Sequence, residues 1–564
     1  MQHDSAQRRG PSRRAVIVGG AAVAVAAATA APANGTGRTA ATIARGYVFD
    51  DADATGVRLS GHAGIGGVMV SNGREVVLTE RDGSWSLPVE SGDSLFVIKP
   101  PNWTTPHDAS GLPLYSYLHQ PEGSPVGAPS LFAGVEPTGP LPTSIDFPLR
   151  RSAEAPRFEV LLMADTQPGN AEELSFVRDS ILSRIPDAAP AFAIHHGDVM
   201  GDDLSLYDRY LRILGATGIP WHHCPGNHDM NLDSREPRFA FETWKRVFGA
   251  THYAFQQANA TFILLNNVDR LDASNTDQAG RGYRGRIGER QLAFVENVLC
   301  HVPQDHLVVV SMHIPLVGFE DPTNPADSTC DRRRLLQRLA RRPFTVSFAG
   351  HSHTTEHHYL GIEDGFERAA PHHHHVLTAA CGSWWSGPRD QRGIPHSDSR
   401  DGSPKGFHVL SIDGNRYETR FVAANERTAG QMRLMLECAR DAGDAARTGH
   451  RLLGCQISAE QRAEARIVVN VFDGGPRTKV VLELEGRARA EKMQRTDMRD
   501  PFVVEFFEQN RETCKPWASA ARSSHIWTLQ LPPDLSAGVY RIKASAIGEY
   551  GATQIGHLLL EIMA

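Results

Sequence analysis

Three blocks with different hydrophobic patterns follow one another along the chain. In the first, between about residues 45 and 150, short apolar runs such as SLFVIKP (94–100) are separated by Gly, Asn, Asp and Pro. The third block, 431–564, repeats this pattern with runs such as GVYRIKASAI (538–547). Short apolar strands between turn residues are typical of small β-sandwiches. We therefore predict a β-sandwich domain at each end, over residues 45–150 and 431–564.

The middle block, from about residue 156 to 424, alternates apolar strand runs with amphipathic stretches such as AEELSFVRDSILSRI (171–185) and GERQLAFVENVLCHV (288–302). The strand runs are apolar on both faces, and runs of this kind separated by helices indicate a sheet that is covered on both sides. The middle block is therefore predicted to be an α/β domain. Its strand runs are FEVLLMA, AFAIHH, IPWHHC, ATFILLNN, LVVVSMH, FTVSFAG and HHVLTAA.

The first residues have the features of an export signal. Arg13 and Arg14 precede an uncharged, alanine-rich run (15–31), which is followed by small residues at spacings that a signal peptidase accepts. Paired arginines before a weakly apolar run are similar to a twin-arginine signal. A membrane anchor is the alternative, but the run is short and alanine is weakly hydrophobic. We predict a twin-arginine-type signal peptide over 1–33, export to the periplasm or beyond, and a mature chain without an integral membrane span.

Composition narrows the classes of function. The chain is 41% hydrophobic and 22% charged, which suits a soluble globular protein and excludes collagen-like and wholly disordered chains. A net charge of −7 without a basic stripe argues against nucleic acid as the main partner. Seven cysteines without a CxxC pair argue against a zinc ribbon. The 26 histidines, many of them clustered, make metal chemistry the first hypothesis to test.

Five strands of the middle block end in residue types that bind metals. Ligands bind outside the carboxyl ends of strands in sheets of this kind, so loops far apart in sequence converge there. Each motif alone is common, whereas five in this order are specific. The strand ends carry Asp165-Thr-Gln167, Gly197-Asp198, Gly226-Asn227-His228-Asp229, His313, and Gly350-His351-Ser-His353.

This order of motifs resembles the calcineurin-like metallophosphoesterase family over roughly residues 157–424. GNHD (226–229) and GHSH (350–353) are the most specific pieces, and the stretch CGSWWSGPRDQRGIPHSDSRDGSPKGF (381–407) looks like one bacterial branch. The flanking blocks are similar to the N- and C-terminal β domains of that branch. The resemblance implies a central β-sandwich flanked by helices (αββα), with a small β-sandwich before it and a second one after it.

The resemblance also implies a pair of divalent metal ions, with Asp198 bridging them and a hydroxide between them as the nucleophile. His228 would then protonate the leaving alkoxide, and Asp229 would hold the tautomer of His228. The resemblance divides the remaining ligands into Asp165, Gln167 and His353 at one ion, and Asn227, His313 and His351 at the other.

Gln167 departs from the commonest family motif, which is D-x-H. Its neutral amide oxygen is a harder and weaker donor than imidazole, and this moves the metal preference from zinc towards manganese, iron, magnesium or calcium. The alternative is that Gln167 does not ligate and that the site holds one metal or is loosely occupied.

Several other residues leave two interpretations open. Trp384 and Trp385 either pack in the core or form a wall of the substrate pocket, and Arg389 either meets phosphate oxygens or is a surface charge. The histidines 372–375 look like a metal-binding tract. Because alternate residues of a strand face opposite sides, at most half of them could reach one ligand. We favour a structural or pocket-lining role for this run.

Cys438 and Cys455 flank a polar stretch between two β segments. In an oxidising compartment they could form a disulfide, worth roughly 3 kcal/mol on the chain-entropy model. The alternative is two thiols that are not bridged.

The sequence therefore predicts an exported, dinuclear metal-dependent phosphoesterase that hydrolyses a phosphomonoester or a phosphodiester, with its chemistry confined to residues 156–424. Two other functions stay open: a wall- or polymer-binding protein with a vestigial metal site, and a pyrophosphohydrolase or nucleotidase. The substrate, the metals and the oligomeric state are not specified by these motifs.

Overall fold

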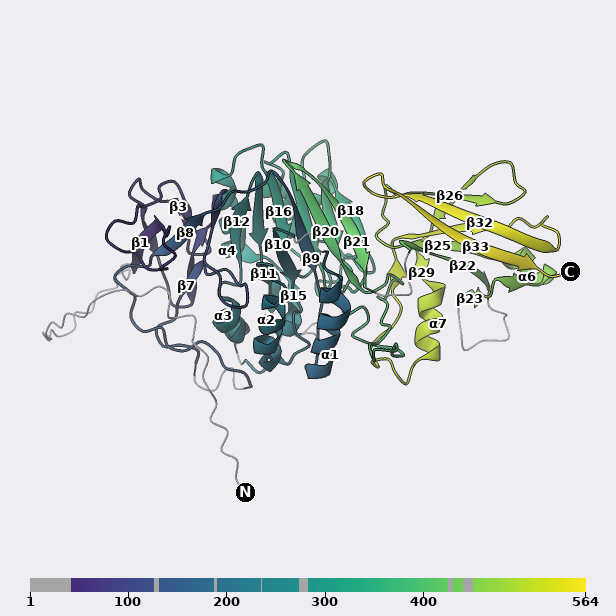
Figure 1. Ribbon diagram of the computed structural model, residues 1–564, viewed down its shortest axis with the longest axis horizontal. Helices are drawn as coiled ribbons and strands as arrows, with labels where there is room; N and C mark the ends of the chain where they lie inside the picture. Colours follow the sequence, from purple (N-terminus) through teal and green to yellow (C-terminus); the bar gives the residue numbers. More distant parts are fainter. Residues whose placement is uncertain are drawn as a thin grey trace, which may run out of the picture.

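The computed structural model describes residues 42–125, 131–186, 190–234, 236–272, 282–424, 430–439 and 450–564. These residues form three β-rich units in a row: an N-terminal module (43–151), a central sandwich (157–423) and a C-terminal module (432–562) (Figure 1). The predicted signal peptide lies outside the described residues. Among those described, no helix combines the length and the apolar character that a membrane crossing requires.

The central sandwich consists of two sheets. In the first, β11, β10 and β9 are parallel, and β20 and β21 add antiparallel strands. In the second, β13, β16, β17 and β19 are parallel, and β12 and β18 are antiparallel at the two edges. The first sheet has the order β11 (Trp221–Cys224), β10 (Phe192–His196), β9 (Arg157–Met163), β20 (Gly406–Asp413) and β21 (Arg416–Ala423). The second has the order β12 (Tyr253–Gln257), β13 (Ala260–Leu264), β16 (Leu307–Ser311), β17 (Thr345–Ala349), β19 (His372–Val376) and β18 (Glu356–Leu360).

Alternating side chains of β9 show how the layers are built. Val160 and Leu162 belong to the core between the sheets, whereas Leu161 and Met163 belong to the core beneath the helices. This period of two is the geometry of an extended strand that is buried on both faces. Across the inner layer, the rings of Phe192 in β10 and Phe262 in β13 lie 5.0 Å apart, edge to face.

Helices cover the outer faces of both sheets, so the predicted αββα architecture is confirmed (Figure 1). The seven strand runs read from the sequence all form strands, whereas β12, β18, β20 and β21 were not recognised. The helices on the first sheet are α1 (Ala171–Phe176), α2 (Tyr207–Gly215) and α3 (Glu242–Phe248). Those on the second are α4 (Gly288–His301) and α5 (Arg332–Leu339), and a hairpin of β14 (Val268–Arg270) and β15 (Tyr283–Gly285) lies beside them in the chain.

The two outer modules are β-sandwiches, as predicted. The N-terminal sheets are β4 (Ser84–Pro88), β1 (Ile43–Asp50), β8 (Phe147–Arg151) and β6 (Trp103–Thr104), and β3 (Val76–Leu78), β2 (Met69–Ser71), β5 (Asp93–Ile98) and β7 (Ser116–His119). The first C-terminal sheet is β23 (His450–Leu453), β22 (Met432–Ala439), β25 (Arg466–Val471), β31 (Ile526–Gln530) and β28 (Gln494–Arg495). The second is β24 (Gln456–Ile457), β33 (Thr553–Ile562), β32 (Gly538–Ile547), β26 (Lys479–Leu484) and β27 (Glu491–Lys492). The C-terminal module also has α6 (Ala459–Glu464), α7 (Pro501–Gln509) and the short pair β29 (Met498–Arg499) and β30 (Arg522–Ser523).

The register of β22 and β23 excludes a disulfide between Cys438 and Cys455, which the sequence left open. Cys438 lies opposite Arg451, and Leu436 lies opposite Leu453, so Cys455 falls about four residues further along the pair. At about 3.3 Å per residue this separates the two Cα atoms by roughly 13 Å. A disulfide needs Cα atoms within about 7 Å. The alternative of two thiols that are not bridged to each other is therefore the one observed.

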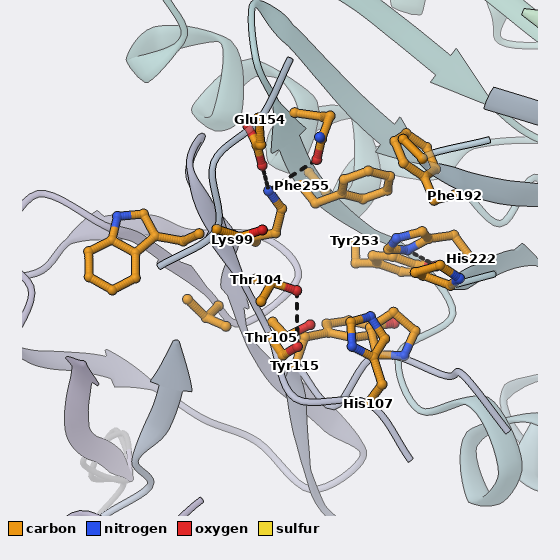
Figure 2. A pocket seen from close by; sticks show the side chains of 18 of the residues that line it. Lys99, Thr104, Thr105, His107, Tyr115, Glu154, Phe192, His222, Tyr253 and Phe255 are labelled. Carbon is orange, nitrogen blue, oxygen red and sulfur yellow. Dashed lines mark hydrogen bonds and ion pairs between the residues drawn. The ribbon is translucent and has the colours of Figure 1, made fainter. Parts of the chain in front are cut away.

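A cavity of about 220 Å³ lies where the N-terminal module meets the central sandwich. Figure 2 shows its lining, in which Lys99 is paired with Glu154 and the aromatic rings of Tyr253 and Phe255 form one side. His222, in the strand that precedes the GNHD motif, stacks on Phe255 with ring centroids 3.8 Å apart. The lining includes none of the predicted metal ligands, so this cavity is separate from the candidate site.

Candidate active site

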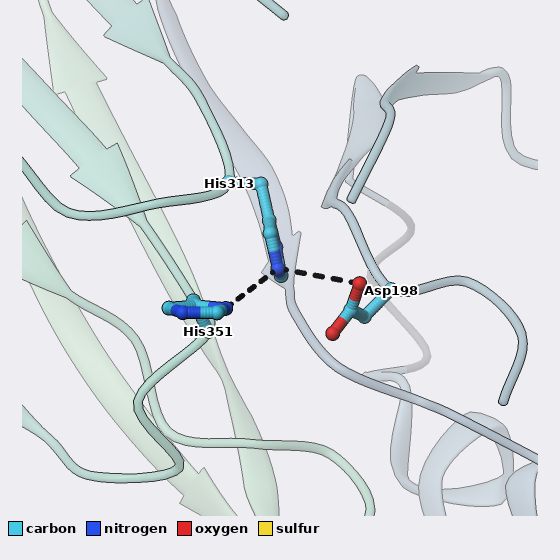
Figure 3. Close-up of side chains that lie close together, drawn as sticks. All are labelled: Asp198, His313 and His351. Atoms are coloured by element: carbon cyan, nitrogen blue, oxygen red, sulfur yellow. Dashed lines mark hydrogen bonds and ion pairs between the residues drawn. The ribbon is translucent and has the colours of Figure 1, made fainter. Parts of the chain in front are cut away.

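Loops from both sheets bring four predicted ligands into contact. Asp198 follows β10, and His313 and His351 follow β16 and β17 (Figure 3). The Nε2 atom of His313 lies 3.3 Å from Asp198 Oδ1 and 3.1 Å from His351 Nδ1. It also lies 3.0 Å from the Oδ1 atom of Asn227. The ligating atoms of Asp198, His313 and His351 all lie within 4.8 Å of one another, which is the convergence that a metal ion requires.

Backbone carbonyl groups orient both imidazoles. His313 Nδ1 lies 2.8 Å from the carbonyl oxygen of His196, and His351 Nε2 lies 3.1 Å from that of Ala326. When these nitrogens donate their protons to the carbonyl groups, His313 Nε2 and His351 Nδ1 keep lone pairs that face the cluster. Metal-binding histidines are commonly held in this way by a partner behind the ring.

The ligands predicted for the other metal site are also gathered here, but less tightly. His353 Nε2 lies 3.8 Å from Asp165 Oδ1, and its Nδ1 atom bonds the carbonyl oxygen of Gly382 at 2.5 Å. Gln167 donates from Nε2 to Asp198 Oδ2 at 2.8 Å, while its oxygen faces the thiol of Cys381 at 3.7 Å. A 180° rotation of the side-chain amide would exchange its nitrogen and its oxygen. Only in the rotated conformation would Gln167 offer its oxygen to a metal.

Strained backbone accompanies the predicted ligands. Asp165, Gln167, Asp198, His351 and His353 all have φ between 35° and 76°, a region that L-residues other than Gly rarely adopt. Strain of this kind persists only where the surrounding structure enforces it, and it concentrates at functional sites. At Gly226 the close packing is also visible, because an added Cβ would lie 2.1 Å from the backbone nitrogen of Asp198. The glycine before Asn227 therefore allows the two loops to meet.

The charges of the site favour bound cations. Burial would lower the pKa of His313, yet the carboxylates of Asp198 and Asp165 raise it to about 9. Burial would raise the pKa of Asp198, but the charges of His313 and His228 hold it well below its usual range. Burial and the charge of Asp198 raise the pKa of Asp165 to about 7. The buried carboxylates and imidazoles are thus strongly coupled, and this set of carboxylate, amide and imidazole donors fits a pair of divalent metal ions.

Comparison with protein families agrees with this geometry. Residues 158–355 match the family model of the calcineurin-like phosphoesterases, and residues 374–553 match the model of the C terminal of calcineurin-like phosphoesterase. The chain belongs to the calcineurin-like phosphoesterase family. The C-terminal model begins within β19, so it includes the last strands of the central sandwich as well as the C-terminal module. The protein is thus a hydrolase of phosphoric esters.

The individual comparisons are more distant. One solved structure, a purple acid phosphatase from the seeds of yellow lupin (Lupinus luteus), aligns with 64% of this phosphoesterase and 67% of its own chain, at 12% identity and a TM-score of 0.35. No curated protein matches the sequence.

The structure corrects the partner assigned to His228 in the phosphoesterase site. His228 is 34% exposed, and its Nδ1 atom lies 2.8 Å from Asp202 Oδ1. Burial opposes protonation of the ring, but Asp198 and Asp202 raise the pKa of His228 to about 9. Asp202 therefore orients the imidazole, and Asp229 does not. The sequence held no signal for this pairing, because Asp202 lies four residues after a ligand motif in a loop with left-handed backbone.

Asp229 instead ties loops of the phosphoesterase together. Its fully buried carboxylate accepts hydrogen bonds from the backbone nitrogens of Val199, Met200 and Gly226, and from the Tyr207 hydroxyl at 2.8 Å. Four donors leave no lone pair aimed at His228. The prediction that Asp229 fixes the tautomer of His228 is therefore wrong, and its role is to hold the GD and GNHD loops at a fixed separation.

The three residues proposed as substrate contacts differ in their surroundings. Trp385 is buried and donates from Nε1 to the carbonyl oxygen of Thr166 at 2.9 Å. It therefore packs in the core. Trp384 is partly exposed and stacks on His353, with ring centroids 4.2 Å apart. Arg389 lies on the surface and forms a bidentate ion pair with Glu172, so it is a surface charge rather than a phosphate contact. Of the three, Trp384 is the one whose ring stacks on a predicted ligand.

Proposed function

We propose that the protein is an exported phosphoesterase with two divalent metal ions, which hydrolyses a phosphomonoester or phosphodiester with His228 as the general acid. The observation that carries this proposal is the convergence of Asp198, Asn227, His313 and His351 beside a partly exposed histidine. When bound, the metal ions would supply Lewis acidity and an activated water. The ligand set mixes carboxylate, amide and imidazole donors, so manganese, iron, magnesium, calcium and zinc are the candidates.

Different side chains would have different roles in the reaction. Asp198 presents one oxygen to His313 and the other to Gln167, and this central position is the one from which a single carboxylate can serve both metal positions. His228 uses Nδ1 for Asp202, which leaves the opposite ring nitrogen to hold the proton for a leaving oxygen. His228 and Trp384 are both partly exposed, which supports a substrate entrance on their side of the site.

A removal experiment tests the metal requirement. Dialysis against a chelator should abolish hydrolysis of nitrophenyl phosphate, and adding back a divalent metal should restore it. The expected loss is large, because the site has no serine or cysteine nucleophile motif that could act without the metals. Unchanged activity in metal-free protein would contradict the mechanism. A folded protein that is inactive both with and without added metals would favour the alternative of a binding protein with a vestigial site.

Export is the second part of the proposal, and it rests on Arg13, Arg14 and the alanine-rich run that follows them. Replacing both arginines by lysine should retain the protein inside the bacterium that expresses it. Cell fractionation and immunoblotting measure the distribution. Equal export of the variant and the unaltered chain would show that a twin-arginine route is not used.

A further inference from the structure

A second buried group of metal-binding residues lies where the central sandwich meets the C-terminal module. It consists of His357 in β18, His375 in β19 and Asp473 in the loop after β25, and their ligating atoms lie within 4.8 Å of one another. Both histidine side chains are completely buried, and Asp473 is 11% exposed. Figure 1 shows the edge of the central sandwich at β18 and β21 facing this module. The group is therefore enclosed between two structural units.

The ligating atoms of the group lie at hydrogen-bonding distances, slightly closer together than donor atoms around one metal ion. The Nε2 atoms of His357 and His375 each lie 3.0 Å from Asp473 Oδ1, and the two rings are stacked with centroids 4.0 Å apart. Ligand atoms about 2.0–2.2 Å from a tetrahedral metal lie roughly 3.4 Å from each other. Neither ring nitrogen of His375 makes a hydrogen bond within the described chain, although both are buried and Nε2 lies 3.0 Å from Asp473 Oδ1. Buried nitrogens without a hydrogen bond are rare, and a cation bound at Nε2 would account for that nitrogen.

The residues behind the group are arranged as supports for metal ligands. His357 Nδ1 lies 2.9 Å from His373 Nε2, and His373 Nδ1 lies 2.9 Å from the hydroxyl of Tyr417. Such a relay lets His357 donate its remaining proton away from the metal. His408 closes another side but is not a ligand. Its Nε2 atom accepts from the backbone of Thr378, so Nδ1 keeps the proton.

The charge balance also favours a cation. The ion-pair contacts of Asp473 in the described part of the chain are all with histidines, namely His357, His375 and His408. No lysine or arginine among the described residues pairs with this carboxylate, and a divalent ion at the group would compensate its negative charge.

The loop that carries Asp473 is built for close approach. Asp473 has φ 75°, the same left-handed backbone as five of the predicted active-site ligands. Two residues later, an added Cβ on Gly475 would lie 2.7 Å from the Cβ of His357, so only glycine lets the loop pack here. Glu549 fixes the far end of the loop by accepting hydrogen bonds from Thr478 and from Tyr359 of β18. The loop thus holds Asp473 against the histidines.

We propose that His357, His375 and Asp473 bind one structural zinc ion that fastens the C-terminal module to the central sandwich. Two imidazoles and a carboxylate are donors that zinc accepts, and a water molecule would complete the four-coordinate shell. The histidine run at 372–375 then divides by face. His373 and His375 serve this site, while His372 and His374 bond Ser347 on the other side of β19. This zinc is independent of the proposed chemistry at Asp198.

Metal analysis of the full mature chain tests the proposal in a background without the active-site ligands. An Asp198→Asn, His313→Asn double variant, loaded with zinc and dialysed, should retain about one zinc per chain. Adding Asp473→Asn, which is nearly isosteric, or His375→Gln should remove that zinc. His374→Gln, a buried substitution on the opposite face of β19, should retain it. X-ray absorption at the zinc edge should show two imidazoles in the coordination shell.

Stability gives a second readout. Zinc should raise the unfolding temperature of the double variant by several degrees, and it should not do so after Asp473→Asn, because only the intact site couples binding to the folded state. A double variant that binds no zinc would overturn the proposal. The same conclusion would follow if folded Asp473→Asn and His375→Gln proteins kept the zinc content of the double variant.

Discussion

Replacing Asp198 by asparagine should reduce kcat/KM on nitrophenyl phosphate by roughly 10³-fold or more. The carboxylate contacts both His313 and Gln167, so it is the one side chain shared by both predicted metal positions. Losing the metals removes several kcal/mol of charge stabilisation in the transition state, and each 1.4 kcal/mol is a factor of about ten in rate. Asparagine keeps an oxygen for the backbone nitrogen of His228, which bonds Asp198 at 2.9 Å, so the loops should stay in place.

Kinetics and metal analysis should be made on the same preparations of Asp198→Asn and of Asp413→Asn. Asp413 is an exposed residue at the end of β20 and supplies a matched control, since its substitution removes the same charge far from the ligands. The control should keep both its activity and its metal. An Asp198→Asn protein that retains full activity would show that hydrolysis takes place elsewhere on the chain.

Replacing His228 by alanine should slow hydrolysis of an alkyl phosphate by about 10²- to 10⁴-fold, the range of general acid catalysis. An alkoxide is a poor leaving group and needs a proton in the transition state, whereas nitrophenolate does not. The same substitution should therefore slow a nitrophenyl ester far less. Metal content should stay unchanged, since the imidazole bonds Asp202 rather than the ligand cluster. Comparing kcat/KM between the two esters cancels losses common to both.

Two neighbouring carboxylates supply the controls for this experiment. Asp202→Asn should also slow the alkyl ester more than the nitrophenyl ester, but by a smaller factor than His228→Ala. It removes only the partner that orients His228. Asp229→Asn should lower the unfolding temperature and slow both esters alike, since its carboxylate holds backbone groups of Val199, Met200 and Gly226. Equal losses on both esters in His228→Ala, together with lost metal, would make His228 a structural residue or a ligand.

The convergence of the predicted ligands could be predicted because each of them follows an apolar strand run. A buried strand that ends in Asp, Asn or His places that side chain at the carboxyl edge of a sheet, and this local rule holds for Asp165, Asp198, His313 and His351. The number of sheets could not be predicted from the hydrophobic pattern. Strands buried on both faces have the same pattern in one helix-covered sheet and in two sheets packed together, so the αββα arrangement came from the family resemblance.

Side-chain partners were not predictable in the same way. Asp229 is adjacent in sequence to His228, but its carboxylate accepts from backbone groups and from Tyr207. The partner of the imidazole is Asp202, which has left-handed backbone and comes from another loop. The proposed cluster at Asp473 depends on how two units pack against each other. The hydrophobic pattern of the chain does not reveal that packing. The segment VFDGG (471–475) does contain Gly475, the glycine that permits it.

The left-handed backbone at the predicted ligands has a consequence for protein engineering. Each such non-glycine residue costs roughly 1 kcal/mol or more, and glycine or asparagine would relieve part of that cost. Directed evolution for heat resistance alone would therefore enrich these two residues at positions 165, 198, 351 and 353. The selected variants would tolerate higher temperatures and would lose catalysis, so a thermostability screen of this protein needs a turnover assay in every round.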